Sequence, residues 1–164
     1  MNASSIMLST RISTTASFGF GSNLPSPINQ VPSNSGPWIN SDNTVFYWSS
    51  SASTYRADIN GGSFTNFTGV SDWGEDTVLT DDMLTAYFNS ARADAAGTNT
   101  LSYQRVWKST RASTAADWGA VTLVTELDSG ASKFIADVSP DGCIIYYSVH
   151  EGTQFHRFQA SKPH

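Results

Sequence analysis

The densest group of chemically capable side chains is the acidic run around Trp73, where Asp72 and Glu75 lie within two positions of the ring. Carboxylates accept hydrogen bonds from sugar hydroxyls, and an indole ring offers a large apolar face. Carboxylate oxygens are also the ligands that Ca²⁺ prefers. These residues are the candidates for a carbohydrate or calcium site in a loop between blades, with Trp73 exposed to the ligand. The interpretation that we favour is a solvated turn between blades that binds nothing.

Three histidines near the C-terminal end form the other group that could bind a metal, namely His150, His156 and His164. A metal site requires its ligands to converge on one point, and this spacing does not enforce convergence. Whether His150 and His156 meet is left open by the sequence. We predict no metal site, no cofactor and no catalytic residue.

The composition excludes several classes of partner. Charged residues make up 14% of the 164 residues, aromatic residues make up 12%, and the net charge is −5. A nucleic-acid partner is excluded because it requires clustered Lys and Arg. Membrane insertion is excluded because no apolar run approaches the length of a spanning helix. Cys143 is the only cysteine, so no disulfide framework is possible, and we expect it to be a buried small hydrophobe.

The composition also bears on location. The chain is rich in Ser and Thr and poor in Lys, which is typical of an exported protein of the periplasm or the extracellular space. The first twenty residues lack a charged segment followed by an apolar core. No signal peptide is therefore expected within this chain.

The elements that must position these residues are repeated. The segment from Ser9 to Thr14, followed by Phe18-Gly19, returns one hundred positions later as Ser109 to Thr114, followed by Trp118-Gly119. Each copy carries an arginine, Arg11 or Arg111, at the same place. We expect these arginines to satisfy loop carbonyls or to bridge neighbouring repeats.

A second element, an aspartate turn followed by an aromatic strand, occurs three times. Its aspartates are Asp42, Asp82 and Asp141, which lie 40 and 59 residues apart. In the last copy Gly142 follows the aspartate and accepts the positive φ that a tight turn requires. Aspartate side chains hydrogen-bond nearby backbone groups in turns. We therefore assign all four residues to turn structure rather than to ligand binding.

Short segments rich in β-branched and aromatic residues, separated by Gly, Asn, Asp and Ser, predict an all-β protein with four strands in each repeat. The repeat cores run over about 37–70, 75–127 and 133–164 of a single domain that spans residues 1–164. The segment 5–28 contributes strands of a further or closing blade. Residues 84–90 are predicted to be a strand, although Met, Leu and Ala nearby favour a helix.

The last aspartate turn, Val138-Ser139-Pro140-Asp141-Gly142, and the strand ending in Tyr146-Tyr147-Ser148 resemble the WD40-like PD40 repeats of the TolB-type β-propeller family. The residues Ala57-Asp58-Ile59 resemble the third-strand element of that repeat. Residues 107–113 resemble the version found in exported proteins of myxobacteria-like bacteria. The first two turns lack the Pro and Gly of the pattern. The resemblance implies a β-propeller that binds or scaffolds rather than catalyses.

The repeats amount to about three and a half blades, whereas closed propellers have four to eight. The chain is therefore either part of a larger propeller or a partial propeller that is completed by oligomerisation. A head-to-tail homodimer would give a six-bladed ring, and we favour a dimer. Within one chain, segment 20–28 is expected to supply the missing fourth strand of the last blade.

We therefore predict a non-catalytic propeller module that binds or scaffolds and assembles by pairing of its blade edges. Its partners would be a second copy of itself and a glycan or a protein or peptide ligand. One alternative is a lectin with sites in the loops between blades, using Asp72, Trp73 and Glu75. The other alternative is a fragment of a propeller hydrolase whose catalytic groups lie elsewhere.

Overall fold

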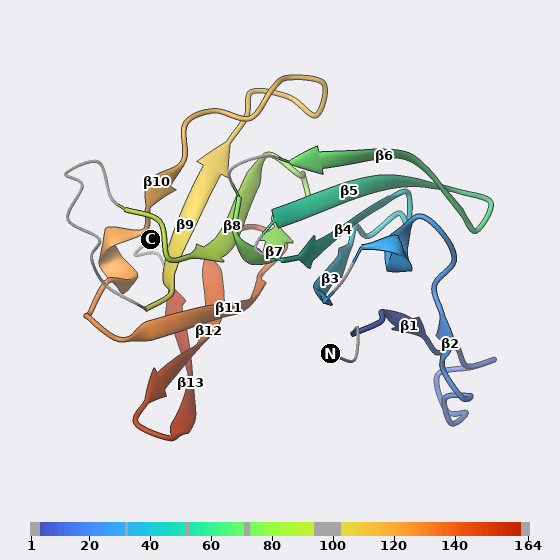
Figure 1. Ribbon diagram of the computed structural model, residues 1–164, viewed down its shortest axis with the longest axis horizontal. Coiled ribbons are helices and arrows are strands. Elements are labelled where there is room, and N and C mark those ends of the chain that lie inside the picture. The colour runs from blue at the N-terminus through green and yellow to red at the C-terminus, as the bar shows by residue number, and fades with distance from the viewer. Residues whose placement is uncertain (1–3, 32, 52, 71–72, 94–102, 162–164) are drawn as a thin grey trace.

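The structure is a computed structural model that describes residues 4–31, 33–51, 53–70, 73–93 and 103–161 (Figure 1). It confirms the predicted all-β class. The only helical segments among these residues are two 3₁₀ turns, η1 (Ile28–Gln30) and η2 (Thr125–Leu127). All other regular elements are strands of antiparallel sheets.

Two sheets have four strands in chain order, as expected of propeller blades. Blade 1 consists of β3 (Asn34–Ile39), β4 (Val45–Ser50), β5 (Ser53–Asn60) and β6 (Ser63–Val70). Blade 2 consists of β7 (Glu75–Leu79), β8 (Thr85–Ser90), β9 (Arg105–Thr110) and β10 (Thr122–Leu123). The prediction of a strand at 84–90 is confirmed by β8, because pairing with neighbours on both sides overrides local helix propensity.

Two further sheets lie at the ends of the chain. Blade 3 has three strands, β11 (Ser132–Val138), β12 (Ile144–Glu151) and β13 (Gln154–Ser161). The N-terminal sheet, which we call the half-blade, pairs β1 (Met7–Leu8) with β2 (Ser22–Asn23). Figure 1 shows the sheets following one another in an arc, with the half-blade at one end and blade 3 at the other.

The half-blade is a structural copy of the outer part of blade 2, as the repeat at one hundred residues indicates. In each copy a loop folds back onto the end of the preceding strand through equivalent hydrogen bonds. Gly19 N donates to Thr10 O at 2.9 Å, and Gly119 N donates to Thr110 O at 2.8 Å. Leu24 N donates to Ile6 O, and Val124 N donates to Val106 O, both at 3.0 Å. Within the loop, Ala16 N donates to Ser13 O at 3.2 Å, and Ala116 N donates to Ser113 O at 3.1 Å.

The expectation that segment 20–28 would complete blade 3 within one chain is wrong. Strand β2 pairs with β1, with Met7 opposite Asn23 and Leu8 opposite Ser22. Residues 28–30 form η1 instead of continuing the strand. The half-blade therefore provides the outer two strands of a further blade, at the opposite end of the arc from β13 (Figure 1).

The core lies between the blades, because alternate residues of each strand face opposite sides of a sheet. On β4, Phe46 and Trp48 pack against the half-blade, whereas Val45 and Tyr47 pack toward blade 2. A third cluster joins Tyr87 and other residues of blade 2 to blade 3. Each blade is thus buried through the neighbours that it has on either side.

Two of the aspartate turns are held by the aspartates themselves. Asp82 Oδ1 accepts hydrogen bonds from Thr80 Oγ1 (2.6 Å) and Leu84 N (2.9 Å). Asp141 Oδ1 accepts hydrogen bonds from Ser139 Oγ (2.6 Å) and from the backbone N–H of Cys143 (3.0 Å). These hydrogen bonds lower the pKa of both carboxyl groups, and the hydroxyl donors have a larger effect than the backbone donors.

The first turn reaches the same geometry with a different residue. Asn40 Oδ1 accepts from Thr44 N (2.8 Å) and Val45 N (2.9 Å), and Asp42 is exposed at the turn. Asn43 has a φ of +55° at the place where Gly142 has +68°. Cys143, expected to be buried, is half-buried at the end of its turn.

Gly74, just before β7, gives a direct test of blade 2. A Cβ at this position would lie 1.6 Å from the carbonyl oxygen of Asn89 on the neighbouring strand. Gly74→Ala must therefore push β7 from β8, and we expect it to lower the free energy of unfolding by about 3 kcal/mol. Gly69→Ala is the control, since its nearest neighbour would be a ring atom at 3.9 Å. Chemical denaturation measures both, and equal stabilities would contradict this packing.

Candidate functional site

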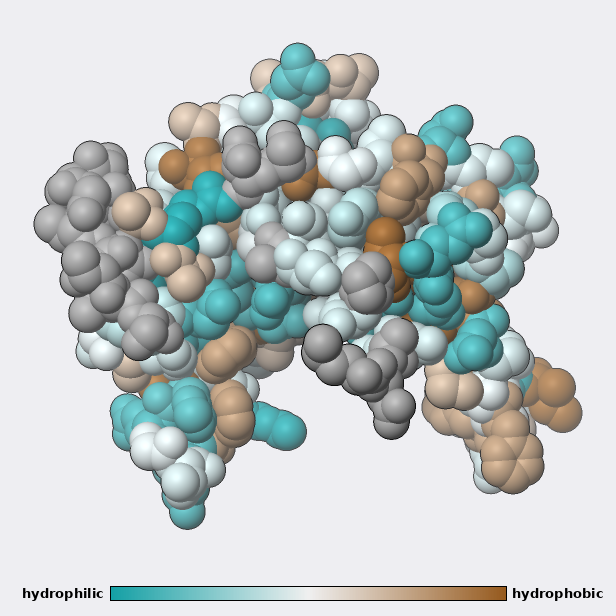
Figure 2. All heavy atoms as spheres, viewed as in Figure 1, coloured by the Kyte–Doolittle hydropathy of each residue, from teal (hydrophilic) through white to brown (hydrophobic). Residues whose placement is uncertain are grey.

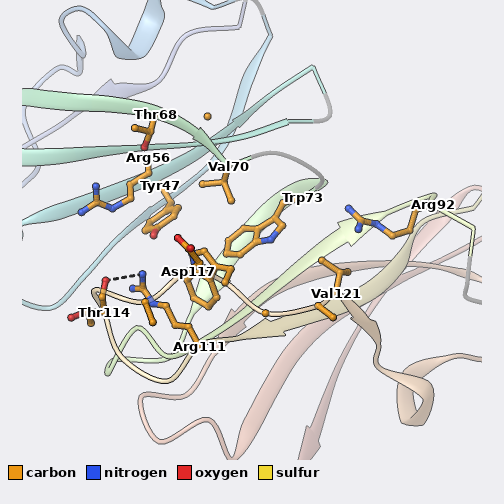
Figure 3. Close-up of a pocket in the computed structure, with 15 residues that line it drawn as sticks. Tyr47, Arg56, Thr68, Val70, Trp73, Arg92, Arg111, Thr114, Asp117 and Val121 are labelled. Carbon is orange, nitrogen blue, oxygen red and sulfur yellow. Dashed lines mark hydrogen bonds between the residues drawn. The ribbon is translucent and has the colours of Figure 1, made fainter.

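A cleft of about 740 Å³ separates the outer strands of blade 1 from the loop that follows β9 in blade 2 (Figure 3). Its walls come from blade 1 and from residues 111–121 of blade 2. The lining residues with polar or aromatic side chains are Tyr47, Arg56, Thr68, Trp73, Arg92, Arg111, Thr114, Asp117 and Trp118.

The blade 1 wall is a straight row of polar side chains. Tyr47 on β4 lies opposite Arg56 on β5, and Arg56 lies opposite Thr68 on β6. Directly opposed residues share one face of a sheet, so all three point toward blade 2. Arg56 also pairs with Asp58 through one guanidinium nitrogen. The neighbouring blade turns this polar face of blade 1 into one wall of a cleft.

The opposite wall is fixed by Arg111, as the repeat predicted. Its Nε donates to the carbonyl of Met83 at 2.9 Å and its Nη1 to the carbonyl of Thr114 at 3.1 Å. The guanidinium also lies 4.3 Å from the ring centre of Trp118, a cation–π contact. The expectation that this arginine satisfies loop carbonyls is therefore confirmed, and Arg11 does the same for Thr14 in the half-blade.

The floor of the cleft carries an unsatisfied donor. Tyr47 is fully buried, and its hydroxyl has no hydrogen-bond partner among the described residues. Desolvation raises the pKa of this phenol, and the nearby positive charges of Arg111 and Arg56 oppose that rise. The side-chain N–H groups of Arg56 and Trp118 lie near the Tyr47 oxygen and also lower its pKa. Neither group has the geometry of a hydrogen bond to this oxygen. A buried hydroxyl without a partner costs free energy unless a ligand or water satisfies it.

Trp73 lines this cleft, but the expectation that its ring is exposed is wrong. Its exposed fraction is 4%. Phe88 stacks on the ring at 5.1 Å between centroids and Tyr47 stacks at 6.4 Å, with Trp118 at its edge at 4.7 Å. The ring is therefore engaged by three aromatic neighbours and packs as part of the core between blades 1 and 2.

The acidic neighbours of Trp73 that the structure describes do not line the cleft with it. Asp72 lies outside the described residues. Glu75 begins β7, is half-buried, and does not line the cleft. Asp76 Oδ2 accepts from Asn89 Nδ2 at 3.0 Å, and Asn89 Oδ1 accepts from the N–H of Ile135 in blade 3 at 2.8 Å. This carboxylate supports an inter-blade network, and burial raises its pKa.

The two histidines that the structure describes do not converge. His150 pairs with Phe155 across β12 and β13, whereas His156 pairs with Val149. Adjacent positions on a strand face opposite sides, so the two imidazoles lie on different faces of blade 3. His150 stacks on Phe155 instead, at 4.6 Å. Within residues 4–161, excluding the undescribed gaps, no group of three or more His, Cys, Asp or Glu is placed to hold a metal.

Comparisons with known proteins support the fold. No protein-family model and no curated protein sequence matches the chain. Among solved structures, the chain is similar to TolB from Acinetobacter baumannii, with a TM-score of 0.52 at 13% identity, over 78% of this chain. The match spans 29% of the TolB chain. The described part of the chain has no helix with the length and apolar character that a membrane crossing requires. The chain therefore has a TolB-like β-propeller fold and corresponds to part of a whole propeller.

The Asp76 network predicts a pH-dependent stability. Because burial raises the pKa of the folded carboxyl above that of the unfolded chain, ionisation opposes folding, and this contribution worsens as the pH rises through the folded pKa. Asp76→Asn removes the charge and keeps an oxygen that can accept from Asn89. We expect its free energy of unfolding to exceed that of the wild type by an amount that grows from about pH 4, near the ordinary aspartate pKa, to pH 7.

Urea denaturation at several pH values measures this difference. Asp76 has a φ of +50°, which Asn tolerates well, so part of any gain will be independent of pH. Only the part that grows with pH reports the charge. A constant difference across the range would contradict a cost of burying the carboxylate.

Proposed function

We propose that the chain is part of a β-propeller that acts as a non-catalytic binding module, with the cleft between blades 1 and 2 as its ligand site. The observation that carries the proposal is the pair of arginines, Arg56 and Arg111, which line the cleft from opposite walls. Two guanidinium groups in one cleft are suited to an anionic group that arrives with a ligand. The row from Tyr47 to Thr68 would hold such a ligand along its length.

The groups that remain free for a ligand define its chemistry. Among the described residues, Nη2 of Arg111 and both Nε and Nη1 of Arg56 make no hydrogen bond. Thr68 adds a hydroxyl and Asp117 adds one acceptor at the rim. Donors outnumber acceptors, so the ligand should carry carboxylate or hydroxyl oxygens. A glycan that bears an acidic sugar meets this description best, and an acidic peptide is the second possibility.

The lectin alternative therefore no longer uses Trp73 as a stacking platform for a sugar. Trp73 packs among Tyr47, Phe88 and Trp118, so a sugar would be held by hydrogen bonds rather than by stacking on that indole. The hydrolase alternative places its catalytic groups elsewhere. Acid–base hydrolysis of glycosides uses two carboxyl groups, and the described lining of the cleft contains one, Asp117. The exported location and the self-association remain parts of the proposal.

The test is binding to an array of acidic and neutral glycans and acidic and neutral peptides. We expect wild-type protein to bind acidic glycans and Arg56→Gln to bind them at least tenfold more weakly, the usual effect of losing one charge-assisted hydrogen bond. Arg157→Gln is the matched control, because Arg157 stands on the third strand of blade 3, away from the cleft. We expect this variant to bind like the wild type.

Two results would contradict the proposal. A folded wild-type protein that binds nothing on the array would remove the cleft as a glycan or peptide site. Equal losses in Arg56→Gln and Arg157→Gln would show that a general loss of positive charge, and not the cleft, weakens binding.

A further inference from the structure

One tyrosine position recurs in all three blades. The turn bonds Asn40 N to Val45 O, Thr80 N to Thr85 O and Ser139 N to Ile144 O align the strands that follow. In this alignment Tyr47, Tyr87 and Tyr146 occupy the same place on β4, β8 and β12. Tyr47 faces blade 2 and is 0% exposed, and Tyr87 faces blade 3 and is 3% exposed. Tyr146 is 41% exposed, and no blade packs against its face among the described residues.

The half-blade shows the complementary gap at the other end. In blade 2 the loop after β9 brings Trp118 against Trp73 at the junction with blade 1, and the ring is half-buried. In the half-blade the same loop, with the same backbone bonds, presents Phe18, which is 62% exposed. Arg11 lies over Phe18 at 4.7 Å, as Arg111 lies over Trp118. The loop has its docking geometry, but no blade packs against it within the part of the chain that the structure describes.

Other apolar side chains accompany Phe18 on this end of the molecule. The large exposed ones of the half-blade and its loop are Met7, Leu8, Ile12, Phe18 and Phe20. Figure 2 shows apolar residues gathered on the protruding arm at the lower right, where Figure 1 places β1 and β2. Contiguous exposed apolar surface of this kind is typical of a protein–protein contact.

We propose that these two faces bind each other in neighbouring copies of the chain. The Tyr146 face of blade 3 in one copy would cover the Phe18 face of the half-blade in the next, as Tyr47 of blade 1 is covered by the Trp118 loop of blade 2 within one chain. The occupant is a second copy because the chain itself carries both halves of this junction. They lie at opposite ends of the arc and do not meet within one molecule (Figure 1).

Two features of blade 3 support this choice. Strand β13 is exposed along nearly its whole length and has a sheet neighbour on one side only. Free strand edges pair readily with other chains. Phe155 of β13 lies opposite His150, which is four positions from Tyr146 on β12. Phe155 and Tyr146 therefore lie on the same face of blade 3, and the ring of Phe155 is also largely exposed. Contact between unlike surfaces is heterologous, so copies would associate head to tail.

The experiment is light scattering behind size exclusion, with the folded state of each variant checked by circular dichroism. Wild-type protein should have a mass of at least two chains of 17.7 kDa each. Phe18→Asp and Tyr146→Asp each remove one of the two faces, and each should reduce the mass to 17.7 kDa. Phe158→Asp is the control, since Phe158 is 47% exposed in blade 3 but lies on the opposite face, stacked on Tyr147.

Mixing the two monomeric variants gives the decisive result. A head-to-tail contact leaves one intact junction between them, between Tyr146 of the Phe18→Asp chain and Phe18 of the Tyr146→Asp chain, so the mixture should recover a species of two chains. A mixture that stays monomeric, a wild type that is monomeric at all concentrations, or a dimer that survives both substitutions would overturn the proposal. None of these results depends on ligand binding in the cleft.

Discussion

The constraint on which the structure depends is that every blade has two faces to bury. A sheet places alternate residues on opposite sides, and β4 carries large apolar side chains on both sides. Phe46 and Trp48 of one strand pack toward the half-blade, while Val45 and Tyr47 of the same strand pack toward blade 2. A blade covered on one side only leaves large side chains in water, at a cost of about 25 cal/mol for each Å² of apolar surface. The succession of blades follows from this need.

The cleft lies between two faces that blades turn toward each other. The row from Tyr47 through Arg56 to Thr68 has a counterpart in blade 2, where Tyr87, Lys108 and Thr122 stand opposite one another. Blades 1 and 2 thus turn the same kind of face, a tyrosine followed by a long cation and a threonine, toward the blade that follows. What distinguishes the junction of blades 1 and 2 is the long loop after β9, which carries Arg111 and Trp118 and borders a space of about 740 Å³ beside the row.

Repetition explains which parts of the fold could be predicted from the sequence. The strand at 84–90 and the half-blade were accessible because their equivalents elsewhere in the chain have clear strand or turn signals. The closure by residues 20–28 was not, because the choice of a pairing partner for β2 depends on the position of the whole half-blade in space. Asp42 illustrates a smaller limit. The turn needs an oxygen that accepts two hydrogen bonds, and Asn40 supplies it two residues earlier.

The site shows where reasoning from residue types fails. Trp73 was expected to be exposed because it has no aromatic equivalent in the other repeats, yet its position at the entry to β7 places it between two blades, where Phe88 and Tyr47 stack on it. Uniqueness in a repeat sequence therefore marked a packing role at a junction. Arg56 is the opposite case, since arginines also stand on the third strands of the other blades, at Arg105 and Arg157. Its partners across the cleft lie 55 or more residues further along the chain, and only the fold brings them together. Residues that recur at every junction are thus the ones to examine where a junction is open, as at Tyr146 and Phe18.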